Sequence, residues 1–143
     1  GVKLSILGDL SQFDNDIKKN ILKASTLNQK NFKINLIMAI NYGARQEITR
    51  AAKEICKKVL KNEIHIDQID ENEIKNNLYT KDLPDPDLII RTGGDSRLSN
   101  FLLWQGAYTE LVFFKKTWPD FTKEDFLKAI TEFKSRERRF GGY

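Results

Sequence analysis

The pattern of hydrophobic and polar positions changes several times along the chain, which predicts strands separated by helices. Val2 to Leu7 has the composition of a buried strand, and the nearly continuous apolar run from Phe32 to Ile40 is typical of a central strand covered on both faces. The segment between them has the spacing of an amphipathic helix, with apolar residues on one face at Phe13, Ile17, Ile21 and Ala24. Ser11 and Asp14 predict a capping box at the start of this helix.

The middle of the chain predicts two more helices. After a turn at Asn41 to Gly43, apolar residues recur at helical spacing at Ile48, Ala51, Ala52, Ile55 and Val59. Asp70 and Glu73 predict a short capped helix that ends near Leu78. Two prolines in the segment from Leu83 to Asp87 then favour an extended approach to the next strand.

The last third of the chain continues the alternation. It predicts a strand from Leu88 to Arg91, a helix from Asn100 to Ala107 and a strand from Glu110 to Phe114. Thr122 and Asp125 form a capping box at the start of a final helix. The whole pattern favours an α/β fold with a mostly parallel central sheet flanked by helices, in which ligands gather beyond the carboxyl ends of the strands.

One such strand end carries chemistry suited to phosphate. Gly93 and Gly94 can adopt backbone angles closed to other residues and turn successive N–H groups toward one ligand. Arg91 and Arg97 add two guanidinium groups that match phosphate oxygens, and Ser99 is placed to cap the helix predicted after it. The positive end of that helix would face the same anion, so the set predicts an anion site.

Asp95 is the exception in this set, because a carboxylate repels a diphosphate unless a divalent cation such as Mg²⁺ lies between them. A Gly-Gly turn by itself is more often a solvated loop than a binding site. The arginines, the serine and the acidic residue together favour the anion site over the solvated loop.

Composition narrows the class of protein. The chain has 143 residues, 40% of them hydrophobic, which fits a single domain. The 24 basic residues exceed the 20 acidic ones and favour anionic partners, but they alternate with acids and lack the aromatic pattern of a nucleic-acid binder. Cys56 is the only cysteine, which excludes a disulfide framework and suits a reducing cytoplasm.

Five segments together resemble the cis-prenyltransferase family. They are Ile6 to Asp9, Asn41 to Arg45, Arg91 to Gln105, Trp118 to Phe121, and Arg136 to Gly142. The resemblance implies a cis-prenyltransferase-like fold with Rossmann-like layering. It also implies an Mg²⁺-dependent prenyltransferase that adds isopentenyl diphosphate units to farnesyl diphosphate and makes undecaprenyl diphosphate, the precursor of a cell-wall carrier lipid.

The resemblance also implies roles for particular residues. Arg91, Arg97 and Ser99 match the residues that hold the diphosphate of isopentenyl diphosphate. Asp95, our candidate catalytic residue, stands where the bacterial enzymes usually have Glu, and Ser96 stands where His is frequent. These two departures bear on the metal geometry and on any proton transfer at the loop.

Two further site predictions come from the second half of the chain. Glu110 matches a residue that helps bind magnesium, although spacing alone would favour a surface ion pair. Arg139 and Gly141 match an Arg-x-Gly element that reaches the neighbouring subunit's site in dimers, although a basic helix end ordinarily complements the helix dipole. We therefore expect a homodimer that acts in the cytoplasm and meets the inner face of the membrane through its lipid product.

The family's first phosphate-binding loop, a His-Met-Asp-Gly-Asn-Gly-Arg-Trp type segment with an essential Asp, has no match here. We therefore expect residues 1–143 to be the C-terminal part of a single domain, truncated at the N-terminus and inactive alone. The alternative is a non-catalytic partner subunit of a heteromeric cis-prenyltransferase, against which the complete diphosphate set argues. A generic nucleotide-binding module would need a Gly-x-Gly-x-x-Gly or Walker loop, and neither occurs.

Overall fold

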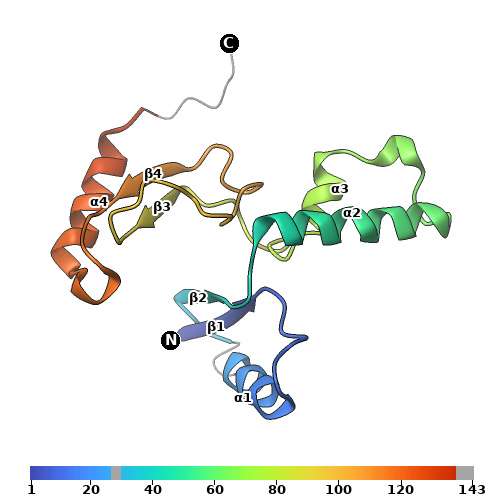
Figure 1. Ribbon diagram of the computed structural model, residues 1–143, viewed down its shortest axis with the longest axis horizontal. Coiled ribbons are helices and arrows are strands. Elements are labelled where there is room, and N and C mark those ends of the chain that lie inside the picture. The colour runs from blue at the N-terminus through green and yellow to red at the C-terminus, as the bar shows by residue number, and fades with distance from the viewer. Residues whose placement is uncertain (27–29, 138–143) are drawn as a thin grey trace. The chain divides into compact units, whose positions relative to one another are not determined.

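A computed structural model describes residues 1–26 and 30–137 of the chain (Figure 1). The chain divides into two compact units, Gly1–Leu83 and Pro84–Tyr143, and each is described here on its own. Each unit contains one pair of parallel strands together with helices. The predicted α/β class with parallel strands is therefore confirmed, and the assignment of both units to one domain stays a prediction.

The first unit begins with a parallel strand pair and a helix. Strand β1 (Val2–Leu7) pairs with β2 (Ile34–Ala39) in a register that runs from Val2 opposite Ile34 to Leu7 opposite Ala39. Helix α1 (Asn15–Ser25) connects them and packs against β1. The predicted box of Ser11 and Asp14 is wrong, because Asp14 is itself the N-cap and the Ser11 N–H donates to Asp9 Oδ1 at 2.8 Å.

One face of β2 is open in the part of the chain that the structure describes. Ile34, Leu36 and Met38 alternate along the strand and are 61, 52 and 46% exposed. The prediction that both faces are covered is therefore wrong for the described residues. An apolar run predicts that a strand is buried in the folded protein, but it does not identify the segment that covers the strand.

The rest of the first unit is helical. Helix α2 (Ala44–Leu60) packs against α3 (Glu71–Asn76) (Figure 1). The segment of chain that connects these two helices contains the short 3₁₀ helix η1 (Ile66–Gln68). Asp70 caps α3 as predicted and accepts a hydrogen bond from the Glu73 N–H at 2.8 Å. Glu47 is fully buried and accepts from Tyr42 Oη and from the Tyr79 N–H, both at 2.6 Å, so its charge is satisfied where α2 begins.

The second unit is built on strands β3 (Leu88–Arg91) and β4 (Glu110–Phe113). They are parallel, with Leu88 opposite Glu110 and Arg91 opposite Phe113. The predicted strands are confirmed, but the predicted helix from Asn100 to Ala107 is wrong, since this segment forms turns. Positive φ angles of 48°, 66° and 46° at Ser99, Asn100 and Leu102 are incompatible with a right-handed helix.

Helix α4 (Lys123–Ser135) packs against β4 and follows the 3₁₀ helix η2 (Trp118–Asp120) in the chain (Figure 1). Its capping box is confirmed, because Thr122 Oγ1 accepts from the Asp125 N–H and Asp125 Oδ2 accepts from the Thr122 N–H at 3.0 Å. The Asp125 side chain is only 4% exposed and also forms an ion pair with Lys116 at 2.7 Å. Asp125 thus joins the start of α4 to the segment that follows β4.

Within residues 1–26 and 30–137, no helix combines the length and the apolar character that crossing a membrane requires.

The ion pair between Asp125 and Lys116 should make the stability of the fold depend on pH in the acid range. The Lys116 ammonium, followed by the Thr122 N–H, lowers the pKa of the Asp125 carboxyl from 3.8 to about 2. A carboxyl whose pKa is lower in the folded state stabilises the fold above its unfolded pKa and loses this effect as pH falls toward the folded pKa. We therefore expect the melting temperature of Asp125→Asn to lie below wild type at neutral pH, with the gap closing between about pH 4 and pH 2. A gap that stays constant over this range contradicts the assignment.

Candidate active site

Four side chains predicted from the sequence lie together beyond the end of β3. Arg91 Nη1 donates to Ser99 Oγ at 2.8 Å and to the carbonyl oxygen of Arg97. Arg91 Nη2 lies 3.2 Å from Asp95 Oδ2, and Arg97 Nη2 lies 2.6 Å from the same oxygen. The structure therefore brings Arg91, Asp95, Arg97 and Ser99 into one cluster, here called the arginine cluster.

The charges of the arginine cluster are arranged for an anion. One carboxylate oxygen of Asp95 receives hydrogen bonds from both guanidinium groups, which places it where an anionic oxygen of a ligand would bind. Each guanidinium has five N–H donors, so Asp95 occupies only part of their capacity. The two arginines also balance the negative charge of Asp95. A carboxylate can therefore lie near a diphosphate here even without a metal ion between the two.

The two glycines have the expected backbone but a different role from the predicted one. Gly93 and Gly94 have φ angles of +94° and +87°, which glycine adopts without strain. Their N–H groups donate to the carbonyl oxygens of Lys116 at 2.7 Å and Phe114 at 2.9 Å. The prediction that these N–H groups point at a ligand is wrong, because they attach the turn to the segment that follows β4.

The predicted role of Ser99 as a helix cap is also wrong, because no helix follows it. Its hydroxyl instead accepts from Arg91, and its side chain lies on the exposed surface of the arginine cluster. Ser99 therefore helps to hold the Arg91 guanidinium, and its hydroxyl hydrogen can be donated elsewhere.

A pocket of about 250 Å³ lies beside the arginine cluster. Its lining combines two guanidinium groups with apolar side chains: Ile89, Ile90, Arg91, Thr92, Arg97, Leu98 and Phe101. Binding pockets typically join a mostly apolar wall to a few polar groups that fix the orientation of the ligand. This pocket suits a small ligand with an anionic end and a hydrocarbon body.

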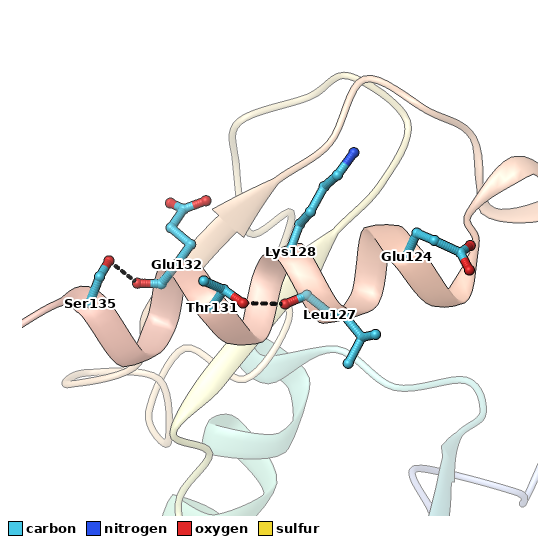
Figure 2. Close-up of a pocket in the computed structure, with 6 residues that line it drawn as sticks. All are labelled: Glu124, Leu127, Lys128, Thr131, Glu132 and Ser135. Carbon is cyan, nitrogen blue, oxygen red and sulfur yellow. Dashed lines mark hydrogen bonds between the residues drawn. The ribbon is translucent and has the colours of Figure 1, made fainter.

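A larger hollow of about 560 Å³ lies on α4 and is a poorer candidate (Figure 2). All of its lining residues belong to this one helix: Glu124, Leu127, Lys128, Thr131, Glu132 and Ser135. Its two hydroxyls donate to carbonyl oxygens of their own helix, Thr131 to Leu127 at 2.9 Å and Ser135 to Glu132 at 2.7 Å (Figure 2). No set of polar groups therefore converges on a ligand there.

Glu110 lies at the other end of the strand pair from Arg91. It starts β4 opposite Leu88, and three residues of strand, about 10 Å, separate that position from the level of Arg91. Its Oε2 accepts from Arg136 Nη1 at 2.7 Å, and Arg136 Nη1 also donates to the carbonyl oxygen of Leu111 at 3.0 Å. The structure shows the ion pair that spacing alone favours, and it shows no contact between Glu110 and the arginine cluster.

Arg136 is the partner of Glu110 that the sequence did not predict. Besides Glu110 it binds Glu132, and these two hydrogen bonds raise the pKa of its guanidinium. In the sequence, the only sign of this role is its place in an arginine-rich stretch that equally suits a helix end. Arg136 ties the end of α4 to the start of β4.

Magnesium can be considered from the carboxylates present. Among the described residues, no group of three or more His, Cys, Asp or Glu side chains is placed to hold a metal ion. Mg²⁺ is nevertheless commonly held by one or two carboxylates and the phosphates of a substrate. Glu110 has a side chain that is 25% exposed but is paired with Arg136, and the Asp95 Oδ2 atom is already bound by both neighbouring arginines, so the role of either carboxylate in holding Mg²⁺ stays a prediction.

Arg139 and Gly141 lie outside the described residues, so the predicted tail element stays a prediction.

Comparisons with known proteins give matches over nearly the whole chain. Residues 1–141 match the family described as "Putative undecaprenyl diphosphate synthase". The chain is 49% identical to an isoprenyl transferase of Clostridium perfringens, with 99% of this chain and 56% of that protein aligned. It is 47% identical to a tritrans,polycis-undecaprenyl-diphosphate synthase (geranylgeranyl-diphosphate specific) of Picrophilus torridus, with 99% of this chain and 55% of that protein aligned.

Two crystal structures are also similar. The lavandulyl diphosphate synthase of Lavandula x intermedia, in complex with dimethylallyl diphosphate, superposes with a TM-score of 0.94 at 38% identity over 99% of this chain and 61% of that one. A probable undecaprenyl diphosphate synthase of Campylobacter jejuni superposes with a TM-score of 0.82 at 38% identity. The superposition covers 99% of this chain and 64% of that one.

The chain therefore belongs to the cis-prenyltransferase family of undecaprenyl diphosphate synthases. It spans a little over half the length of the curated relatives it matches.

The backbone of the glycine turn yields a stability prediction. A side chain at Gly93 would meet no atom within 4 Å, so Gly93→Ala adds backbone strain without a steric clash. We expect this strain to lower the free energy of unfolding by roughly 1–2 kcal/mol in urea denaturation. Ser96→Ala, in the same loop but without a positive φ angle, is the matched control and should change it by less than about 0.5 kcal/mol. Equal values for the two variants would show that the turn is not constrained at Gly93.

Proposed function

We propose that this chain is part of an Mg²⁺-dependent cis-prenyltransferase that joins isopentenyl diphosphate to an allylic diphosphate. The observation that carries the proposal is the arginine cluster, whose two arginines line a pocket together with apolar side chains. Isopentenyl diphosphate has the two parts that this site would bind, a diphosphate head with up to three negative charges and a short branched hydrocarbon. The family assignment supports the same reaction class.

In the proposed binding mode the diphosphate contacts the Arg91 and Arg97 guanidinium groups and the Ser99 hydroxyl. Arginine binds phosphate oxygens through parallel N–H donors, which fixes the orientation of the ligand as well as its charge. The hydrocarbon end then lies along Ile89, Leu98 and Phe101, which supply apolar surface for it. This orientation would aim the double bond away from the arginines and toward the second substrate.

The proposed reaction breaks one bond and forms another. The C–O bond of the allylic diphosphate breaks, the isopentenyl double bond attacks the resulting cation, and the new C–C bond forms with loss of one proton. Mg²⁺, when bound, would neutralise the departing diphosphate. Glu110 is the proposed ligand for this ion. Its carboxylate would then have to bind the ion and Arg136 at the same time.

Asp95 remains the proposed catalytic residue of the loop. Its carboxylate holds Arg91 and Arg97 close together, and a diphosphate oxygen would compete with it for the same N–H donors. Entry of the substrate would then release the Asp95 carboxylate from these donors and leave it able to act as a base or a metal ligand.

The finer identity is also a proposal. We propose farnesyl diphosphate as the primer and undecaprenyl diphosphate, for cell-wall carrier lipid, as the product. The primer needs a direct test, because the similar proteins are associated with different allylic diphosphates. The Picrophilus torridus relative is named as specific for geranylgeranyl diphosphate, and the lavandulyl diphosphate synthase structure contains dimethylallyl diphosphate. The proposed enzyme is a homodimer in the cytoplasm at the inner face of the membrane, with Arg139 and Gly141 completing the neighbouring site.

The direct test uses the complete protein with labelled isopentenyl diphosphate and, in separate reactions, farnesyl, geranylgeranyl or dimethylallyl diphosphate. We expect Mg²⁺-dependent extension from farnesyl diphosphate to one long polyprenyl length, and none after chelation with EDTA. Extension from another primer would correct the proposed substrate. A protein that extends no primer would support the non-catalytic partner subunit instead.

A substitution in the arginine cluster tests the binding mode. Arg97→Ala removes one charged donor, which is worth about 1.5–3 kcal/mol, so the dissociation constant for isopentenyl diphosphate should rise about 10- to 100-fold. Calorimetric titration measures it. Lys134→Ala, which removes a positive charge from the exposed surface of α4, is the matched control and should leave the constant unchanged. An equal effect of both changes would point to general charge rather than a specific contact.

A further inference from the structure

The glycine turn of the arginine cluster is attached to the segment after β4 by backbone hydrogen bonds. A Cβ at Gly93 would have no neighbour within 4 Å, and one at Gly94 would have only the carbonyl oxygen of Lys115, at 4.0 Å. No atom packs closely where a side chain of either glycine would lie. The two glycines are instead attached by the bonds from their N–H groups to the carbonyl oxygens of Lys116 and Phe114.

The accepting segment is itself attached at two points. Next to β3, the Phe114 N–H donates to the carbonyl oxygen of Arg91 at 2.8 Å, which continues the strand pairing by one residue. Farther along, Lys116 Nζ donates to Asp125 Oδ2 at 2.7 Å. The same residue, Lys116, thus accepts from the turn through its backbone and binds α4 through its side chain.

Asp125 is a firm attachment point. Its side chain is 4% exposed, and its Oδ2 also accepts from the N–H and hydroxyl of Thr122 at 3.0 and 2.9 Å. Lys128 lies 4.0 Å from the other oxygen, with its own side chain 75% exposed. The capping box of α4 by itself needs only Thr122 and Asp125, so the bond to Lys116 has no part in starting the helix.

We propose that Lys116 and Asp125 are positioning residues for the diphosphate site: their ion pair fixes the carbonyl group that holds Gly93, and through this turn it sets where Asp95 and Arg97 meet the ligand. This inference rests on the proposed function for its ligand. The mechanical link between the ion pair and the glycine turn stands independently of that function.

The test is Lys116→Met in the complete protein. The change keeps the backbone carbonyl and a side chain of similar length but removes the ion pair. We expect the dissociation constant for isopentenyl diphosphate to rise about fivefold or more, as for the loss of one hydrogen bond. We expect kcat at saturating substrate to change less than twofold, and amide hydrogen exchange at Gly93 to become faster.

Three further variants identify the cause. Lys116→Arg restores the ion pair and should restore both binding and exchange. Lys128→Met removes a charge that faces Asp125 without touching the turn, and should leave both unchanged. Asp125→Asn should weaken binding as Lys116→Met does, with an additional fall in melting temperature because it also alters the cap.

Each result bears on the inference separately from the proposed function. Unchanged Gly93 exchange in Lys116→Met overturns the inference, even where binding is weaker, because Lys116 would then act on the ligand directly. Equal effects of Lys116→Met and Lys128→Met also overturn it. A wild-type protein that does not bind isopentenyl diphosphate contradicts the proposed function, while the exchange measurement still tests the link between the ion pair and the turn.

Discussion

The candidate site depends on one carboxylate that two guanidinium groups share. Arg91 and Arg97 repel each other, and they converge because Asp95 Oδ2 accepts from both. The same arrangement leaves further N–H donors around a point that already binds one anionic oxygen. A site of this kind is preorganised for a ligand with several anionic oxygens. The two positive charges are already close together in the free protein, so the ligand does not have to overcome their repulsion when it binds.

The frame around this carboxylate is made of backbone, and it explains why the loop has this sequence. Strand β3 delivers Arg91, the two glycines turn the chain through positive φ angles, and the segment after β4 receives their N–H groups. The segment is in turn attached to α4 through Asp125. In our proposal the position of the arginine cluster therefore depends on Asp125 in α4, a residue far away along the chain.

Regular elements could be predicted from the sequence because their signals are local and repeated. The strands Val2–Leu7 and Leu88–Arg91, the N-cap at Asp70 and the capping box at Thr122 follow from side-chain period and hydrogen-bonding chemistry. The helix expected after Ser99 was wrong because its apolar spacing says nothing of the positive φ angles that break it. The clustering of Arg91, Asp95, Arg97 and Ser99 was predictable, whereas the acceptors of the glycine N–H groups and the partner of Glu110 come from segments far away in the sequence.

The central claim is that the arginine cluster holds the diphosphate of isopentenyl diphosphate. A crystal structure of the complete protein with this compound tests it most directly. The account predicts diphosphate oxygens within hydrogen-bond distance of the Arg91 and Arg97 guanidinium groups and of Ser99 Oγ, with the hydrocarbon lying along Ile89 and Phe101. A diphosphate bound elsewhere, with Asp95 still joined to both arginines and the cluster empty of ligand, would contradict it.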